Sequence, residues 1–313
     1  DIRKGDTLGD PQHVENGEIM RFDRVIANPP FSLKNWGRDL AENDGYGRYR
    51  FGVPPKDAGD LAFVQHMISS LNNEGVMGVV VPHGVLFRGG AEGEIRKGIL
   101  ESDLLEAVIG LPSALFYGTG IPAALLIINK QKEQTKRGKV LFINAELNYQ
   151  EEKNQNILRD QDIEKIVSCF DSYNDIKRFS RVISIHEIKD KGYNLNIRRY
   201  ADTSPPPENF DVKGILYGGI PIEEIEDEYI QEILEGLELS VVLMSKDSKY
   251  MKFKDEIKDK SQIRQILGDV SDSVIEQFER WWDKYGTSLS QIDSEIKESE
   301  ELIHRYIKEL GYE

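Results

Sequence analysis

The chain of 313 residues contains a single cysteine, Cys169, and no run of 18 consecutive apolar residues. One cysteine cannot form an internal disulfide and is typical of a reducing compartment, so we expect a cytoplasmic location. Without a long apolar run, the sequence predicts no membrane-spanning helix and no membrane partner. Hydrophobic residues make up 39% of the chain, which is enough for a core, and its length suggests two domains.

Several motifs of catalysis and ligand binding are also missing. The histidines are scattered without metal-ligand spacing, so we expect no metal site. The sequence has no glycine-flanked serine elbow, which argues against a covalent hydrolase. The glycine clusters at residues 88–93 and 117–120 lack the Gly-Lys-Ser/Thr ending of a nucleotide-phosphate loop. These absences leave other kinds of chemistry to consider.

The tetrapeptide Asn28-Pro29-Pro30-Phe31 directly follows the apolar run Phe22–Ala27, which predicts a strand that ends in a stiff turn. Proline lacks an N–H, fixes its own φ and drives the preceding residue into extended geometry, so the turn is poorly suited to continue a sheet. Ligands of open α/β sheets bind outside the carboxyl ends of the strands. The position therefore predicts an active-site turn, although asparagine and proline also simply punctuate strands.

The residue types of this turn fit the methylation of an amino group conjugated with a ring, such as the exocyclic nitrogen of adenine. Such a nitrogen is a poor nucleophile. The side-chain oxygen of Asn28 and the carbonyl of Pro29 can accept both of its N–H bonds and stabilise the positive charge that develops on attack. Pro30 stiffens the turn, and Phe31 offers a ring face to a base taken out of its stack.

The formal net charge of −15 is unfavourable for a DNA enzyme, because affinity for DNA normally comes from neutralising phosphates. Cations nevertheless follow the turn, interleaved with aromatic residues, and they include Lys34, Arg38, Arg48 and Arg50. We expect these side chains to meet a DNA backbone near a flipped base. The alternative is a solvated loop with incidental charges. The overall acidity indicates a partner that carries most of the DNA affinity.

The first half of the chain alternates expected strands and helices. We predict strands at residues 22–27, 76–81, 104–110, 123–129 and 140–144, and helices at residues 59–72 and 93–102. The polar residues 130–139 predict a turn that pairs the last two strands with each other. This order is typical of an α/β fold with a partial doubly wound sheet that ends in antiparallel strands.

The second half is more polar and predicts a mainly helical C-terminal region. We expect a catalytic domain at residues 1–150, a connecting helical segment and stiff linker at residues 151–207, and a helical tail at residues 208–313. Apolar residues in the tail recur at steps of three and four, as in a heptad seam. The seam runs through Ile275, Phe278, Trp282, Tyr285, Leu289, Ile292, Ile296, Ser299, Ile303, Tyr306 and Leu310.

Gly286 interrupts this seam, and Thr287 or Ser288 could cap a new helix, so we expect two helices rather than one rod. The seam could pack on its own domain or dock on another chain.

These features resemble the modification (methyltransferase) subunit of a type I restriction-modification system, an adenine-N6 DNA methyltransferase. Further segments stand in the order and spacing of that family: Gly5-Asp6-Thr7-Leu8, Asp60-Leu61-Ala62-Phe63, Gly78-Val79-Val80-Val81-Pro82, Leu111-Pro112, Phe116-Tyr117-Gly118-Thr119-Gly120-Ile121-Pro122, Tyr193-Asn194-Leu195-Asn196-Ile197 and Glu309-Leu310-Gly311-Tyr312-Glu313. The resemblance covers almost the whole chain.

The resemblance implies a Rossmann-like methyltransferase sheet, S-adenosylmethionine as cofactor, and DNA, a specificity subunit and a restriction subunit as partners. It implies that Asp6, Thr7 and Asn28 bind the cofactor, with Asp6 at its adenine. It also places Phe116 or Tyr117 near the target base as a second wall, and it favours docking of the tail on the specificity subunit.

One departure concerns the family's glycine-rich cofactor turn, which this sequence lacks. We therefore expect a fragment that begins near the third strand of the catalytic domain, without the N-terminal domain, and that binds the cofactor weakly or not at all by itself. Two alternatives stay open. A methyltransferase acting on ribosomal RNA or on a protein glutamine can use a similar turn, and this chain alone could be a non-catalytic interaction module.

Overall fold

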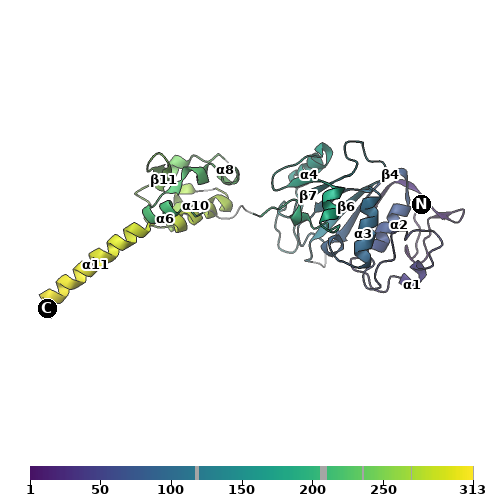
Figure 1. The fold of residues 1–313 in the computed structure, drawn as a ribbon, viewed down its shortest axis with the longest axis horizontal. Helices are drawn as coiled ribbons and strands as arrows, with labels where there is room; N and C mark the ends of the chain where they lie inside the picture. Colours follow the sequence, from purple (N-terminus) through teal and green to yellow (C-terminus); the bar gives the residue numbers. More distant parts are fainter. Residues whose placement is uncertain (117–119, 205–209, 235, 269, 313) are drawn as a thin grey trace. The chain divides into compact units, whose positions relative to one another are not determined.

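The computed structural model describes residues 1–116, 120–204, 210–234, 236–268 and 270–312. The chain divides into two compact units, Asp1–Ser204 and Pro205–Glu313 (Figure 1). Of residues 151–207, which the sequence predicts to be a connecting helical segment and linker, residues 151–204 are part of the first unit. The prolines of the expected linker, Pro205 to Pro207, lie outside the described residues. In the described part of the chain, none of the helices combines the length and apolar character needed to cross a membrane.

The first unit is built on a six-stranded sheet in the order β3-β4-β6-β5-β7-β8. Its strands are β3 (Phe22–Ala27), β4 (Leu71–Pro82), β5 (Leu105–Gly110), β6 (Ala123–Asn129), β7 (Lys139–Asn144) and β8 (Ser180–Ser184). The pairs β3/β4 and β5/β7 are parallel, whereas β6 and β8 run antiparallel to their neighbours. The α/β fold class predicted from the sequence is confirmed.

The predicted pairing of residues 123–129 with residues 140–144 is wrong. Strand β6 lies between β4 and β5, and β7 pairs with β5 and β8 instead. The polar residues between β6 and β7 are held by the start of β5, where Lys132 Nζ lies 2.6 Å from Asp103 Oδ1 and Lys136 Nζ lies 3.1 Å from Glu106 Oε1. These ion pairs hold the loop against the start of β5, and β7 pairs on the other side of that strand from β6.

Helices cover the two faces of the sheet with separate cores. Helices α2 (Asp60–Ser69) and α3 (Ala91–Glu101) pack on the face that includes Val79 and Val108, and α4 (Asp160–Ser172) packs on the face of Ala107 and Ile109. Alternate residues of β5 thus enter different cores, as the period of a strand requires. The remaining elements of this unit are short: β1 (Val14–Glu15), β2 (Glu18–Ile19), α1 (Arg38–Ala41), α5 (Ile185–Asp190) and 3-10 helices at His83–Leu86 and Ile197–Arg199.

Part of the second face of the sheet is not covered by the described residues. A hollow of about 680 Å³ lies over β3, β4 and β6, and its lining is largely apolar, with Ile26, Val80 and Ile127 among the residues. Ile26 is 87% exposed. Asn28 lines the same hollow, so the turn after β3 stands at the end of this open apolar face.

The second unit is mainly helical, as predicted, with a small antiparallel sheet that the sequence analysis did not predict. Its elements are α6 (Val212–Tyr217), β9 (Ile220–Pro221), α7 (Ile222–Ile225), α8 (Glu228–Leu234), a 3-10 helix (Leu239–Val241), β10 (Leu243–Ser245), β11 (Tyr250–Phe253), α9 (Ser261–Leu267), α10 (Asp272–Tyr285) and α11 (Leu289–Glu309). The sheet has the order β10-β11-β9. Phe278 and Trp281 of α10 are fully buried at the centre of its core.

The expectation of two helices in the tail is confirmed, and Ser288 caps the second by accepting the N–H of Gln291. The two halves of the heptad seam differ in burial. Ile275, Phe278 and Tyr285 of α10 are buried in their own unit. In α11, all of whose residues are described, none is buried, and Ile296 and Ile303 are 51% and 55% exposed. The seam of α10 is therefore core, whereas that of α11 is an apolar stripe on the surface.

Candidate functional site

The turn at residues 28–31 follows β3 directly and stands at the carboxyl end of that strand. Asn28 and Pro30 are exposed, and Pro29 and Phe31 are half-buried. Neither the side-chain amide of Asn28 nor the carbonyl of Pro29 has a hydrogen-bond partner among the residues that the structure describes. Both acceptors named from the sequence are thus available to a ligand at the edge of the sheet.

Phe31 forms one side of an aromatic pair. Its ring meets that of Phe116 edge to face, with the centroids 6.1 Å apart and the planes at 77°. The structure thus brings Phe116, one of the two residues proposed as a second wall, against the turn. Tyr117, the other, lies outside the described residues, as do Gly118 and Thr119.

The turn is anchored to the start of α2. The N–H of Ser32 donates to Asp60 Oδ1 at 2.7 Å, and the N–H of Gly59 donates to the carbonyl of Leu33 at 3.1 Å. Behind it, the buried indole of Trp36 donates to the carbonyl of Pro55 at 2.8 Å. The turn is therefore held from its C-terminal side by residues far away in the sequence. Sequence reasoning did not assign Asp60 a role, and the only signal was its place in the motif Asp60-Leu61-Ala62-Phe63.

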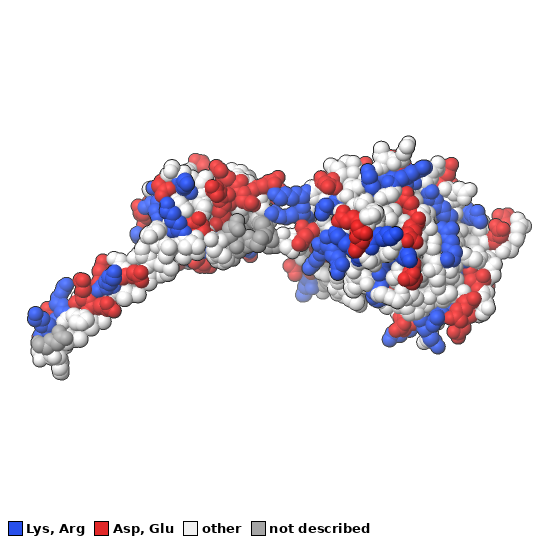
Figure 2. Space-filling model, in the orientation of Figure 1, with Lys and Arg blue, Asp and Glu red and all other residues white. Residues whose placement is uncertain are grey.

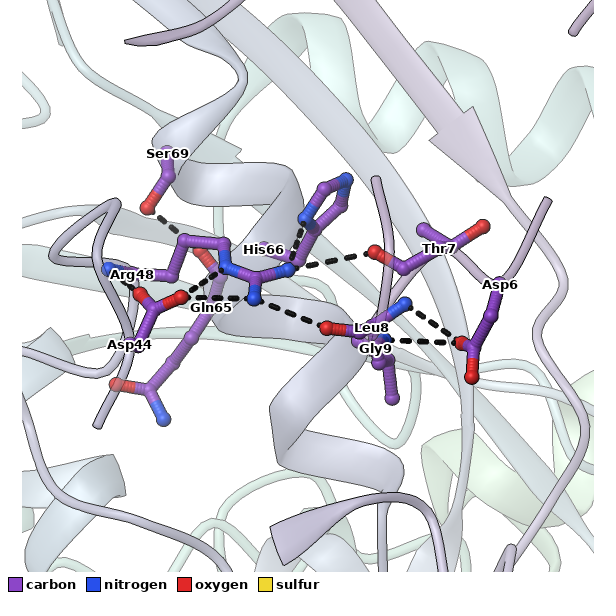
Figure 3. Close-up of polar contacts among 9 residues, drawn as sticks. All are labelled: Asp6, Thr7, Leu8, Gly9, Asp44, Arg48, Gln65, His66 and Ser69. Carbon is purple, nitrogen blue, oxygen red and sulfur yellow. Dashed lines mark hydrogen bonds and ion pairs between the residues drawn. The ribbon is translucent and has the colours of Figure 1, made fainter. Parts of the chain in front are cut away.

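The segment around Asp6 is a tight turn of its own. Asp6 Oδ1 accepts the N–H groups of Leu8 and Gly9, both at 3.0 Å (Figure 3). Its Oδ2 accepts no hydrogen bond from any residue in the described ranges. Asp6 and Thr7 are exposed, so the carboxylate has one oxygen free to accept from a ligand.

Arg48 lies at the centre of a polar cluster that ties this turn to α2 (Figure 3). Its Nη2 lies 2.8 Å from Asp44 Oδ1 and donates to the carbonyl of Leu8 at 2.9 Å. Its Nη1 lies 3.3 Å from the carbonyl of Thr7 and 3.2 Å from Nδ1 of His66. The residue is only 5% exposed. This contradicts the expectation that Arg48 contacts a DNA backbone, because its guanidinium is buried and bound within the protein.

The charges of this cluster shift the acidities of its members. Burial alone would raise the pKa of Asp44, but the hydrogen bonds and positive charge of Arg48 hold that pKa below its ordinary value. Burial and then the charge of Arg48 lower the pKa of His66 to about 4. The imidazole is therefore neutral near pH 7, where Nδ1 can accept from Arg48.

The acid sensitivity of the fold tests this arrangement. The folded-state pKa of His66, about 4, lies below its ordinary value of 6.5, so the unfolded chain takes up the proton first. Stability is thus full above pH 6.5 and falls as the pH drops toward 4. The loss should reach about 1.4 kcal/mol at pH 5.5, one unit below the ordinary value.

We expect His66→Asn, which keeps an acceptor for Arg48, to remove this part of the acid sensitivity. Urea denaturation of parent and variant at pH 7 and pH 5.5 measures it. His83, whose pKa burial also lowers, is present in both proteins and cancels in the comparison. An equal loss of stability in the two proteins would contradict the assignment.

The other predicted cations lie in different places. Lys34 and Arg38 are exposed on the segment that follows the turn, and Arg38 Nη2 lies 3.2 Å from Glu42 Oε1. Arg50 is exposed too, but it lines a hollow of about 420 Å³ with Arg21 and Lys130. Those two residues flank the start of β3 and the end of β6, so Arg50 belongs to the sheet edge opposite Asn28.

Basic side chains thus gather less tightly around the turn than the sequence suggests. Figure 2 shows acidic and basic residues interspersed over the visible face of the first unit. Within the described ranges, no group of three or more histidine, cysteine, aspartate or glutamate side chains could hold a metal ion.

The sequence of the chain is similar to those of known methylases. Residues 1–209 match the family described as N-6 DNA Methylase. The methylase subunit of the type I restriction enzyme MjaVII from Methanocaldococcus jannaschii is 38% identical over 247 residues, which are 76% of this chain and 42% of that protein. The corresponding subunit of MpnII from Mycoplasma pneumoniae is 33% identical over 216 residues, 68% of this chain and 38% of that protein.

A solved structure of a methyltransferase subunit also resembles this chain. The methyltransferase subunit of a type I restriction-modification system from Streptococcus thermophilus has a TM-score of 0.57 and 39% identity, and the match covers 63% of this chain and 41% of that protein. The chain spans less than half the length of these relatives. The matched residues include the turn, its anchor on α2 and the whole six-stranded sheet. The chain therefore belongs to the N-6 DNA methylase family.

Proposed function

We propose that the protein methylates the N6 amino group of adenine in DNA, with S-adenosylmethionine as methyl donor, as the modification subunit of a type I restriction-modification complex. One observation carries the proposal: in a member of this family, the Asn28 amide and the Pro29 carbonyl stand at the carboxyl end of β3 without partners among the described residues. Two free acceptors beside an aromatic ring are what the adenine amino group requires.

The side chains of the turn would act mainly by positioning and electrostatics. The Asn28 oxygen and the Pro29 carbonyl would accept the two N–H bonds, orient the nitrogen lone pair and stabilise the positive charge that develops on it. Phe31 would stack on the extruded base. The free energy of this stacking would offset part of the free energy lost when the base leaves the duplex. The edge-to-face contact with Phe116 holds the Phe31 ring in place for this task.

The residues present fit part of a cofactor site. Asp6 keeps one carboxylate oxygen free and exposed, so it can accept from the amino group of an adenine, and Thr7 and Asn28 would complete the contacts. The cofactor supplies the sulfonium methyl group when bound. Asp6 and Thr7 would contribute specificity for the adenine of the cofactor. Because the sequence lacks the glycine-rich turn of the family, we infer that residues 1–313 alone bind the cofactor weakly.

Partner subunits are proposed on charge and on the surface of α11. A chain with a net charge of −15 needs a partner to hold DNA, and the relatives from Methanocaldococcus jannaschii and Mycoplasma pneumoniae are named as subunits of type I restriction enzymes. A specificity subunit would supply the DNA affinity, and a restriction subunit would belong to the same complex. The apolar stripe of α11 is suited to dock on a helix of the specificity subunit.

We expect Ile296→Asp to weaken binding of the specificity subunit more than tenfold, because it places a charge at the centre of an apolar interface. Ile296 is 51% exposed, so the change should leave the fold of the chain itself intact. Ser294→Asp adds the same charge on the opposite face of α11 and serves as the matched control. Calorimetric titration measures both. Equal affinities of the two variants would show that the stripe is not the docking surface.

The substrate class can be tested by following the methyl group. The complete polypeptide, with its specificity subunit, is incubated with cofactor labelled in the methyl group and a mixture of DNA, RNA and protein. The proposal requires the label to enter DNA. Label in ribosomal RNA or in a protein glutamine would keep the chemistry of the turn and refute the DNA assignment, and no transfer at all would favour a non-catalytic interaction module.

A further inference from the structure

We propose that Asp60 is a positioning residue for methyl transfer. It fixes the conformation of the turn at residues 28–31 and has Arg88 as its counter-ion. The inference rests on the proposed function, which it deepens. Asp60 touches neither substrate nor cofactor in this account. It acts through the backbone that follows Phe31.

The backbone of the turn needs an external support. Ser32, directly after Phe31, has a φ of 51°, in the left-handed region that costs a residue with a side chain roughly 1–2 kcal/mol. Pro29 and Pro30 have no N–H with which to bind the sheet. The N–H of Ser32 donates instead to Asp60 Oδ1 at 2.7 Å, a bond strengthened by the charge of the acceptor. The bond stabilises the left-handed residue and so fixes the backbone directly after Phe31.

Asp60 is well placed to hold this bond. It is the first residue of α2, where the positive end of the helix dipole favours a carboxylate, and it is 2% exposed. Its Oδ2 is buried and has no hydrogen-bond partner among the described residues. The nearest opposite charge is Arg88, whose Nη1 lies 3.6 Å away. Burying a carboxylate with one oxygen that accepts no hydrogen bond costs folding free energy. Its presence therefore indicates a role other than stabilising the fold.

Arg88 links the carboxylate to two neighbouring elements. Its Nη1 also lies 3.3 Å from Oε1 of Glu92, in the first turn of α3, and Glu92 is 2% exposed. Burial raises the pKa of Glu92, and the charge of Asp60 adds to this shift. At the end of β4, the guanidinium lies on Gly84, where an added Cβ would stand 2.3 Å from Arg88 Nη2. Gly84 thus leaves the space that lets Arg88 reach the carboxylates.

The test compares Asp60→Asn with Asp57→Asn in the complete polypeptide. Asparagine keeps an acceptor for the Ser32 N–H but removes the charge, and Asp57 is an exposed aspartate three residues earlier. We expect kcat for DNA methylation to fall about tenfold in Asp60→Asn, the effect of weakening one charge-assisted bond, with KM for the cofactor within twofold of the parent. Asp57→Asn should match the parent. Equal kcat values for the two variants would overturn the proposal.

A second variant reaches the same site without altering either carboxylate. Gly84→Ala would push the Arg88 guanidinium from its place by occupying it. We expect kcat to fall severalfold and no further loss when Gly84→Ala is added to Asp60→Asn, because the two changes break the same connection. Additive losses would show that Gly84 and Asp60 act separately. This variant also decides the matter if Asp60→Asn does not fold.

Hydrogen exchange separates this inference from the proposed function. In the full chain of residues 1–313, the backbone amides of residues 31–35 should exchange about tenfold faster in Asp60→Asn than in Asp57→Asn, at an unchanged melting temperature. If the parent protein does not methylate DNA, the proposed function fails, and the exchange result still shows whether Asp60 fixes the turn. Unchanged exchange in residues 31–35 would refute the positioning role even in an active methyltransferase.

Discussion

Replacing Asn28 with alanine is expected to lower kcat for adenine methylation at least about 100-fold, the loss seen when a preorganised group that stabilises transition-state charge is removed. The amide of Asn28 is exposed at the end of β3 and unpartnered among the described residues, so its loss breaks no contact that holds the fold. Single-turnover methylation with excess enzyme measures the effect on chemistry directly. The melting temperature should stay the same.

Two further variants give this prediction its controls. Asn43→Ala removes an exposed asparagine fifteen residues later and should leave kcat unchanged. Asn28→Asp keeps an oxygen acceptor at the same place and should retain more activity than Asn28→Ala. An Asn28→Ala protein with parental kcat would remove the amide from the mechanism, whatever the other variants do.

The second large effect is expected from Phe31→Ala. A base stacked on an aromatic ring gains roughly 1–3 kcal/mol, so the loss of this ring should weaken binding of target DNA about 30-fold. Phe31 is half-buried, and its contact with the Phe116 ring leaves part of its surface open to a ligand. The complex is titrated with a duplex that carries 2-aminopurine at the target position, whose fluorescence reports whether the base is stacked.

Phe22→Ala is the matched control, because Phe22 is a partly exposed phenylalanine at the opposite end of the same strand. We expect it to bind target DNA as the parent does. A Phe31→Tyr variant keeps the ring and should restore most of the affinity. If Phe31→Ala and Phe22→Ala bind equally well, the base does not stack on Phe31.

Local sequence patterns predicted five of the six strands of the sheet in the first unit, together with α2, α3, α10 and α11, but they gave the wrong pairing for β6 and β7. Strand β6 begins and ends where the continuous run of apolar residues at 123–128 and the following Asn129 indicate. The pairing of β7 was missed because residues adjacent in the sequence suggested a hairpin. The loop after β6 instead contacts the start of β5, for example through Lys132 and Asp103, which are 29 positions apart in the sequence. No local pattern encodes such contacts.

In the candidate site, too, local patterns predicted what consecutive residues determine and missed what contacts between distant residues determine. The turn at residues 28–31 could be read from four consecutive residues, and the structure places it at the carboxyl end of β3. The role of Arg48 could not, because its partners include carbonyls 40 and 41 residues away. A charged residue in a polar loop suggests exposure, and only the folded chain reveals the carbonyls that bury it. The bond between Asp60 and the turn could not be predicted either, because Ser32 lies 28 residues away in the sequence.

The apolar seam of the tail shows how far periodicity reaches. The steps of three and four predicted both helices, but they gave no sign that α10 buries its stripe while α11 leaves its own exposed. The difference depends on the small sheet and short helices that surround α10, such as β11 and α9. Burial of a helical stripe is therefore a property of the whole unit.

The central claim is that the turn after β3 directs a methyl group to N6 of adenine. The most direct measurement is to methylate DNA with the complete polypeptide and its specificity subunit, digest the product to nucleosides and identify the labelled nucleoside by mass spectrometry. The account predicts N6-methyldeoxyadenosine, and none from the Asn28→Ala protein. Label in any other nucleoside, or the same yield of N6-methyldeoxyadenosine from Asn28→Ala, would contradict it.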